Sequence, residues 1–238
     1  MSRFIAEIAL IIGAYLIGSF PYLLILSRAK GVNIAYSEDF HISVWRKVGR
    51  LEGFSGIVFD ILKGVLPVLI GFICDFRLVI IAIAGMAAVI GQMWPVFQKF
   101  NGGKGNTTGG GMALTLTLFL GNGAPLALCS GIIFFALGFG VKVISRLINR
   151  RQTIKEVLEF RGPVSNSLPV GMLAGFFVMP LASWLLNQPL EMTLALTGVF
   201  VAIAIRRLTA NLSKDLKSPR TSTGRILLNR FLFDRSYF

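Results

Sequence analysis

The residues best suited to chemistry lie in a polar, glycine-rich segment, Asn101–Gly111, between two strongly apolar stretches. Glycines let the backbone come close to a ligand and turn its N–H groups inward. If a helix begins near Thr107 or Thr108, its unpaired N–H groups and positive dipole end face the same place. A lysine beside such amides predicts a site for phosphate or another anion. The lysine is Lys104, and the glycines around it are Gly102, Gly103 and Gly105.

A second interpretation of the same segment stays open. A flexible loop whose lysine only marks the cytoplasmic side of a membrane protein would show the same residue types, and these types alone do not separate the two interpretations. The segment is not a Walker A loop, because Lys104 is followed by Gly105, where that motif has Ser or Thr.

No metal site and no cofactor is expected from the sequence. The two cysteines, Cys74 and Cys129, stand alone in apolar surroundings and show no metal-ligand spacing. They are interpreted as small core residues. The single histidine, His41, cannot hold a zinc ion by itself.

The composition is that of an integral membrane protein. Of the 238 residues, 54% are hydrophobic and only 15% are charged. A soluble domain of this size carries more charge on its surface. The net charge of +13 could indicate a nucleic-acid partner, so the positions of the basic residues decide the matter.

Seven apolar segments are predicted to cross the bilayer as helices. Polar, glycine-rich or proline-containing segments separate them. The fourth segment is short and begins inside the glycine-rich stretch. The first lacks a basic start and a small-residue cleavage site, so it is a span and not a signal peptide. The predicted spans are Phe4–Leu26, Phe54–Cys74, Leu78–Phe97, Met112–Leu120, Ala124–Val143, Pro163–Leu186 and Leu190–Ile205.

The basic residues fall almost entirely on one side of these spans. Twenty-one of the 24 Lys and Arg residues lie in alternate loops and the tail, whereas Arg3 and Arg77 lie on the other side and Lys63 within a span. The positive-inside rule then places the amino terminus outside and the carboxyl terminus in the cytoplasm. We expect an all-α polytopic helix bundle with no nucleic-acid partner. Residues 1–210 would form a single membrane domain, and residues 211–238 a basic cytoplasmic or interfacial tail.

Two charged residues, Asp60 and Lys63, lie within the second predicted span. Charged groups inside a span are costly and tend to face the protein interior and pair. The spacing of three residues puts both on one helical face, close enough to neutralise each other. In a functional interpretation Asp60 orients a residue of the site, and in a structural one the pair is a satisfied contact between helices. The spacing favours the structural interpretation.

Four segments of the chain are similar to the signature motifs of one known family. Gly91–Gly105 is similar to a second signature, G-H-x-F-P-x-F-x-x-F-x-G-G-K-G. Gly18–Tyr22 resembles G-S-I-P-x, Phe59–Gly64 resembles L-D-x-x-K-G, and Arg206–Asn211 resembles R-H-x-x-N. Together these motifs resemble those of the bacterial acyl-phosphate:glycerol-3-phosphate acyltransferases. The resemblance covers nearly the whole chain. The family has seven spans with the amino terminus outside, the arrangement predicted above.

The resemblance implies transfer of a fatty acyl group from acyl phosphate to glycerol 3-phosphate, which makes lysophosphatidic acid for phospholipid synthesis. It implies a multi-pass protein of the bacterial inner (plasma) membrane whose partners are these substrates and membrane lipids. Lys104 would hold a substrate phosphate, with Gly102, Gly103 and Gly105 shaping a backbone cradle. Arg46 would pair bidentately with glycerol phosphate. Ser165 and Asn211 match the third signature and the carboxyl-terminal motif, and the supporting positions are Asp60, Lys63, Thr107 and Thr108.

No residue is assigned as a catalytic acid or base by the resemblance. Chemistry in this family needs mainly positioning and charge neutralisation, and the phosphate of the donor can itself act as base. The second-signature histidine is Gln92 here, and the histidine after the last span is Leu208. The chain also has a polar insertion around Arg150–Phe160.

The first signature, G-S-G-N-x-G-A-x-N, aligns with 35–43, which keeps almost none of it. Ser37 and Ser43 would form a donor cradle if they approach Lys104. Glu38 and Asp39 would instead bring negative charge towards a negative ligand. Two hypotheses follow: an acyltransferase with a rebuilt donor site, and a non-catalytic paralogue that binds an anionic lipid or phosphate.

Overall fold

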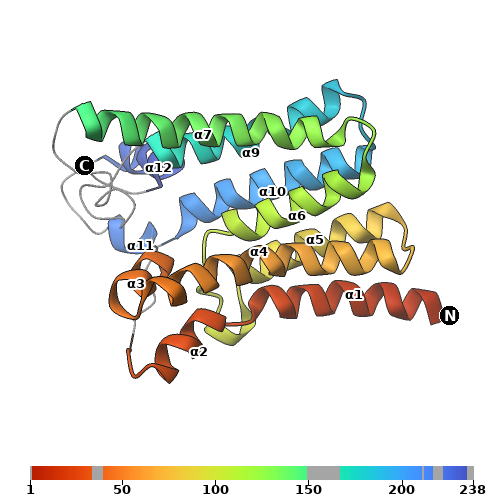
Figure 1. Ribbon diagram of the computed structural model, residues 1–238, viewed down its shortest axis with the longest axis horizontal. Helices are drawn as coiled ribbons and strands as arrows, with labels where there is room; N and C mark the ends of the chain where they lie inside the picture. The colour runs from red at the N-terminus through yellow and green to blue at the C-terminus, as the bar shows by residue number, and fades with distance from the viewer. Residues whose placement is uncertain (1, 34–39, 149–166, 211, 217–221, 235–238) are drawn as a thin grey trace.

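The computed structural model describes residues 2–33, 40–148, 167–210, 212–216 and 222–234, and the regular elements in this part of the chain are all helices. The long helices lie side by side along one direction (Figure 1). The elements are α1 (Ser2–Ser19), α2 (Tyr22–Ala29), α3 (Phe40–Lys47), α4 (Arg50–Ile73), α5 (Leu78–Met93), η1 (Val96–Gln98), α6 (Asn106–Leu120), α7 (Ala124–Ile148), α9 (Ser167–Leu185), α10 (Leu190–Thr209), α11 (Leu212–Asp215) and α12 (Thr223–Phe233).

Six described stretches are long and apolar enough to cross a membrane. They correspond to all the predicted spans except the fourth. That one is α6, whose 15 residues reach only about 22 Å, less than the ~30 Å hydrocarbon core of a bilayer. The six stretches are Arg3–Ala29, Arg50–Ile73, Leu78–Gln98, Ala124–Ser145, Ser167–Leu185 and Leu190–Thr209.

The first predicted span is broken near its end, which the sequence analysis did not anticipate. The helix α1 ends at Ser19, and α2 begins at Tyr22 after Pro21. Proline has no N–H to donate to the preceding turn and interrupts the helix at this point. The break brings the α1–α2 junction to the end of the bundle where α3, α11 and α12 also lie (left in Figure 1).

Close backbone contacts join the helices around the centre. A Cβ added at Gly18 of α1 would lie 2.1 Å from the carbonyl oxygen of Ala88 in α5, and one at Gly91 would lie 2.2 Å from that of Tyr15. A Cβ added at Gly64 of α4 would lie 2.0 Å from the carbonyl oxygen of Thr108. Small residues that let helix backbones approach in this way are typical of membrane bundles.

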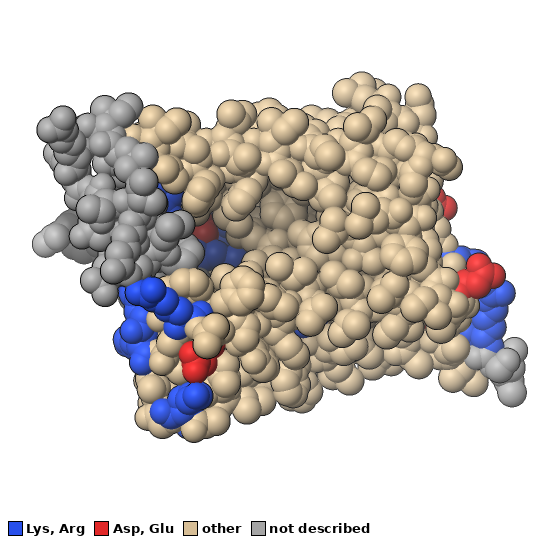
Figure 2. Space-filling model, viewed as in Figure 1, with Lys and Arg blue, Asp and Glu red and all other residues tan. Residues whose placement is uncertain are grey.

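The outer surface fits a membrane environment. Large hydrophobic side chains are exposed along the long helices, and on the face in Figure 2 most of the visible charged residues lie at the two ends. At the end that carries few basic residues, Arg77 Nη2 lies 2.8 Å from Glu7 Oε2. This contact gives the carboxylate within the first span a partner. The hydrogen bonds that Arg77 donates to Glu7 raise the pKa of the guanidinium above its usual range.

The tail contributes a helix, α12, which packs against α9 and α10. Ile226 and Arg230 are buried, at 2% and 3% exposure. Arg230 contacts the carboxylate of Asp215 and the carbonyl oxygen of Ala210. Arg207 of α10 donates to the carbonyl oxygen of Phe231 over 3.3 Å. The tail helix is therefore held on the bundle by buried arginines.

Candidate functional site

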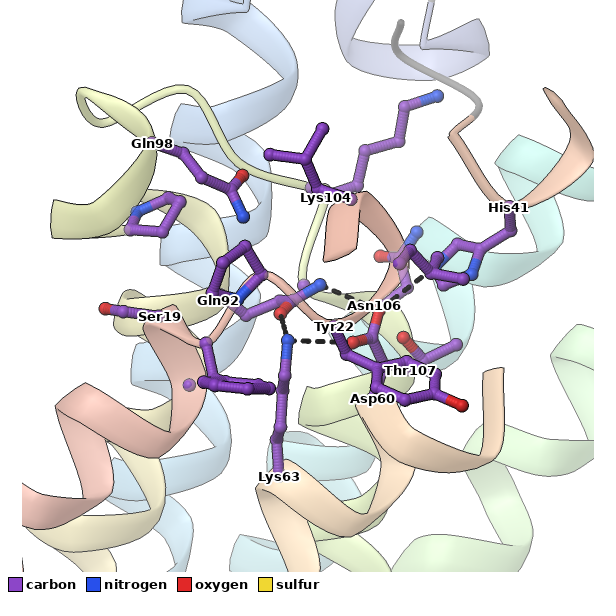
Figure 3. Close-up of a pocket in the computed structure, with 18 of the residues that line it drawn as sticks. Ser19, Tyr22, His41, Asp60, Lys63, Gln92, Gln98, Lys104, Asn106 and Thr107 are labelled. Atoms are coloured by element: carbon purple, nitrogen blue, oxygen red, sulfur yellow. Dashed lines mark hydrogen bonds and ion pairs between the residues drawn. The ribbon is translucent and has the colours of Figure 1, made fainter. Parts of the chain in front are cut away.

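A cavity of about 260 Å³ lies at the end of the bundle that carries α2, α3 and α12 (Figures 1 and 3). Apolar side chains of the α1–α2 junction and α9 form part of its wall. Polar side chains come from the same junction, from α3, α4, α5 and α10, from the segment between α5 and α6 with the start of α6, and from the residue after α12. The polar and charged lining residues are Ser19, Tyr22, His41, Asp60, Lys63, Gln92, Gln98, Lys104, Asn106, Thr107, Arg207 and Asp234.

Backbone hydrogen bonds join the glycine-rich loop to the end of α5. The N–H of Gly102 donates to the carbonyl oxygen of Met93 over 3.2 Å, and the N–H of Gly103 donates to that of Gln92 over 3.0 Å. Arg206 donates to the carbonyl oxygens of Gly102 and Gly103 over 2.7 and 3.2 Å. The predicted cradle needs a correction here, because these two amides are bonded within the protein. A Cβ at Gly102 would lie 2.2 Å from the Gln92 carbonyl oxygen, which explains the glycine.

The amides at the start of α6 are the ones placed for an anion. The helix begins at Asn106, beside the predicted start, and follows Gly105 in the left-handed region at φ +75°. No side chain caps this end, so the first N–H groups are available to a ligand. Asn106 and Thr107 line the cavity there. Thr108 lies below them, where its buried hydroxyl donates to the carbonyl oxygen of Asp60 over 2.8 Å.

Lys104, which the sequence predicts to hold a phosphate, lines the cavity. Its Nζ lies 2.6 Å from Oδ2 of Asp234, and the two side chains are 21% and 11% exposed. In Figure 3 the ammonium group points away from the cluster around Asp60. Sequence reasoning did not find Asp234, because nothing local to the tail links it to the glycine-rich segment.

Asp60 and Lys63 form the predicted pair, with Lys63 Nζ 3.0 Å from Asp60 Oδ1 and both side chains 5% exposed. Gln92 joins them through both ends of its amide. Its Nε2 donates to Asp60 Oδ2 over 2.8 Å, and its Oε1 accepts from Lys63 over 2.6 Å (Figure 3). We call these three residues the floor network. All three residues line the cavity, so the Asp60–Lys63 pair, which the sequence predicts as a structural contact, is also part of the cavity wall.

His41 is the functional candidate that the sequence analysis set aside. Its Nε2 lies 3.0 Å from Asp60 Oδ2, and the residue lines the cavity from α3. The signal in the sequence was Gln92, which stands where the family signature has a histidine. The structure brings an imidazole from another helix to the carboxylate that Gln92 also contacts.

Several buried polar atoms of the cavity residues have no hydrogen-bond partner among the described residues. Buried polar atoms of this kind cost free energy until a ligand bonds to them. A ligand with hydroxyl groups can both donate to and accept from such atoms. They are Ser19 Oγ, His41 Nδ1, Gln98 Oε1, Asn106 Oδ1 and Arg207 Nε.

The other predicted site residues that the structure describes do not line this cavity. Arg46 is exposed on α3, and Ser43 is half-buried on the same helix. Gly102 and Thr108 lie behind the lining. Ser37, Ser165 and Asn211 fall outside the described residues. Within the described ranges, no group of three or more His, Cys, Asp or Glu residues could hold a metal ion.

Comparison with known proteins gives a consistent result. The profile of the glycerol-3-phosphate acyltransferase family matches residues 8–217. A relative of that name from Geotalea daltonii is 38% identical over 133 residues, which cover 55% of this chain and 65% of the relative. One from Geobacter metallireducens is 43% identical over 124 residues, 51% of this chain and 60% of the relative. The chain thus spans less than two thirds of each of these relatives.

A third relative matches over almost its full length. The glycerol-3-phosphate acyltransferase of Desulforamulus reducens is 25% identical over 224 residues, 92% of this chain and 96% of the relative. The fold is similar to that of PlsY, an integral membrane glycerol 3-phosphate acyltransferase, in its glycerol 3-phosphate form. The TM-score is 0.62 at 22% identity, covering 93% of this chain and 98% of PlsY. Because the family profile covers most of the sequence and the helices match a membrane-protein fold, the chain belongs to the glycerol-3-phosphate acyltransferase family of integral membrane proteins.

Proposed function

We propose that this protein transfers a fatty acyl group from acyl phosphate to the 1-hydroxyl of glycerol 3-phosphate and forms lysophosphatidic acid. The names of its relatives support this activity. The observation that carries it is the position of Lys104 beside the uncapped start of α6, in a cavity with polar and apolar walls. An ammonium group and helix-terminal amides together are suited to a phosphate.

The remaining walls suit the other parts of the two substrates. The unpartnered polar atoms of Ser19, Gln98 and Asn106 can bond to the hydroxyl groups of glycerol. Leu168 and Met172 of α9 offer an apolar surface to the acyl chain of the donor. A cavity with both kinds of wall fits a reaction between a charged, water-soluble acceptor and a lipid donor.

In the reaction, the acceptor oxygen forms a bond to the acyl carbon, and the bond between that carbon and the phosphate oxygen breaks. The departing phosphate takes the proton of the hydroxyl, so the protein need not supply an acid or base. Its part is to hold the two groups together and to offset the negative charge of the phosphates. Lys104 and the first amides of α6 are the groups assigned to this task, and Arg46, Ser43, Ser37, Ser165 and Asn211 are further proposed contacts.

We further propose that α6 acts as a seventh, short span within the bundle of a bacterial inner membrane. The concentration of Lys and Arg at the end with the cavity supports a cytoplasmic position for that end and for the carboxyl terminus. The amino terminus would lie outside. The membrane domain would comprise residues 1–210, and residues 211–238 would be a cytoplasmic tail whose helix packs on the bundle.

The proposed function is tested with purified protein in liposomes, given glycerol 3-phosphate and either acyl phosphate or acyl-CoA. We expect lysophosphatidic acid from acyl phosphate only. Lys104→Ala should lower the rate about 100-fold or more, as for the loss of one preorganised charge-stabilising donor. Arg28→Ala removes an exposed charge of α2 that does not line the cavity and serves as the control. Wild-type protein that makes no product from either donor would favour the non-catalytic, anion-binding paralogue.

A further inference from the structure

We propose that Asp234 determines which anions the site accepts, because it pairs with Lys104 until a doubly charged phosphate displaces it. This inference rests on the proposed function, in which Lys104 is a phosphate-binding group. It assigns a role in ligand selection to the tail of the chain.

The first support is the contact itself. Lys104 Nζ and Asp234 Oδ2 are 2.6 Å apart, and the two side chains are 21% and 11% exposed. Charge-assisted contacts of this length are among the stronger hydrogen bonds in proteins. Partial burial weakens the screening that makes most surface ion pairs worth little. A ligand that binds the Lys104 ammonium group must therefore compete with this carboxylate.

The second support is the way the carboxylate is held. Asp234 ends α12 in the left-handed region, at φ 59°, and its N–H donates to the carbonyl oxygen of Arg230 over 3.0 Å. The helix before it is fixed by the buried Ile226 and Arg230 and by the contact between Arg207 and Phe231. The carboxylate is thus carried into the cavity wall by a packed element, which gives it a high effective concentration at Lys104.

The third support is the position of Asp234 in the chain. The family profile ends at residue 217, and the other polar lining residues of the cavity all precede that point. Asp234 therefore lies beyond the segment that the family profile matches, and it lines a cavity whose other polar residues all lie within that segment. It faces the residue of the second signature that the resemblance assigns to phosphate.

The charge of a ligand determines whether it can displace the Asp234 carboxylate from Lys104. A phosphate monoester carries nearly two negative charges at neutral pH, and it also gains the amides at the start of α6. A carboxylate ligand brings one charge, the same as Asp234, and must overcome a competitor that is already in place. The pairing therefore favours phosphate esters over carboxylates of similar size at this site.

The experiment measures binding, so it does not depend on turnover. Purified wild type and Asp234→Asn are titrated calorimetrically with glycerol 3-phosphate and with glycerate, which has a carboxylate in place of the phosphate ester. Asparagine adopts the left-handed region readily, so the end of α12 is preserved. We expect the variant to bind glycerol 3-phosphate about five-fold more tightly than the wild type. We also expect it to bind glycerate measurably, whereas the wild type should not. Asp75→Asn, at a left-handed position far from the cavity, is the matched control.

Unchanged or weaker glycerol 3-phosphate binding by Asp234→Asn, with an unfolding temperature equal to that of the wild type, would overturn the inference. If the unfolding temperature of Asp234→Asn falls, Asp234→Glu is the deciding variant, because it keeps the negative charge. It should then keep the wild-type preference for glycerol 3-phosphate over glycerate, and loss of that preference would overturn the inference. A wild type that makes no lysophosphatidic acid, together with tighter anion binding by Asp234→Asn, would contradict the proposed function and leave the inference standing.

Discussion

His41 Nε2 lies 3.0 Å from Asp60 Oδ2, so the short helix α3 is joined to α4 at a carboxylate that Lys63 and Gln92 also contact. The Asp60 side chain therefore connects α3 and α5 to α4, while its backbone carbonyl accepts a hydrogen bond from α6 through Thr108. Four elements that form the cavity meet at one residue.

Removal of the imidazole should loosen this junction. We expect His41→Ala to lower kcat/KM for glycerol 3-phosphate about ten-fold, because a hydrogen bond to a charged group is worth about 1.5–3 kcal/mol. His41→Gln should retain most of the activity, since its amide can still donate to Asp60. The measurement is steady-state kinetics in liposomes, with Lys47→Ala on the same helix as control. Equal losses in both His41 variants would show that the hydrogen bond is not what matters.

The buried pair of the floor network should behave as a unit. Lys63→Met leaves the carboxylate of Asp60 without its ammonium partner and should cost about 3–5 kcal/mol of unfolding free energy. The double variant with Asp60→Asn and Lys63→Met should recover part of this loss, because no unpaired buried charge remains. Chemical unfolding in detergent micelles measures both effects. Additive losses in the double variant would contradict the pairing.

Arg206 should be needed to hold the glycine-rich loop. It donates to the carbonyl oxygens of Gly102 and Gly103 and lies over the Trp94 ring at 5.9 Å. Arg206→Ala should raise KM for glycerol 3-phosphate about ten-fold or more by displacing Lys104. Arg206→Lys should give a KM between those of the wild type and Arg206→Ala, because lysine keeps the charge but lacks the planar fork that spans two carbonyls. Arg225→Ala, exposed on α12, should leave KM unchanged.

Gly64 should tolerate no side chain. A Cβ there would lie 2.0 Å from the carbonyl oxygen of Thr108, so Gly64→Ala forces α4 and α6 apart and should cost about 1–3 kcal/mol. Gly13→Ala is the comparison, because nothing lies within 4 Å of a Cβ at that position. Thermal unfolding in detergent should show a lower midpoint for Gly64→Ala only. Equal midpoints would mean that the two helices are not packed as closely as described.

The helical elements were predictable because a long apolar run and its breakers are local properties of the sequence. The start of α6 near Thr107 and the pairing of Asp60 with Lys63 follow from similarly local rules, namely glycine before a helix and spacing along one helix face. The shortness of the fourth apolar segment was also predictable, from the glycine-containing segments on either side of it. The break at Pro21 modifies the first predicted span, because proline interrupts the helix within an otherwise continuous hydrophobic pattern.

The site was only partly predictable, because its main contacts join residues far apart in the chain. Lys104 was identified from its glycine neighbours, whereas Asp234 reaches it only through the packing of α12. The sequence predicts the pairing of Asp60 with Lys63, but no local pattern places His41 from α3 beside the same carboxylate. The amides of Gly102 and Gly103 donate to backbone carbonyls at the end of α5, which residue types alone do not reveal.

The touching backbones at Gly18 and Gly91 have a mechanical consequence. Two helices whose backbones touch at both points resist sliding or rotation against each other. We therefore expect α1 and α5 to move as one rigid unit. Amide hydrogen exchange in nanodiscs would register this as uniformly slow exchange along the contacting parts of α1 and α5.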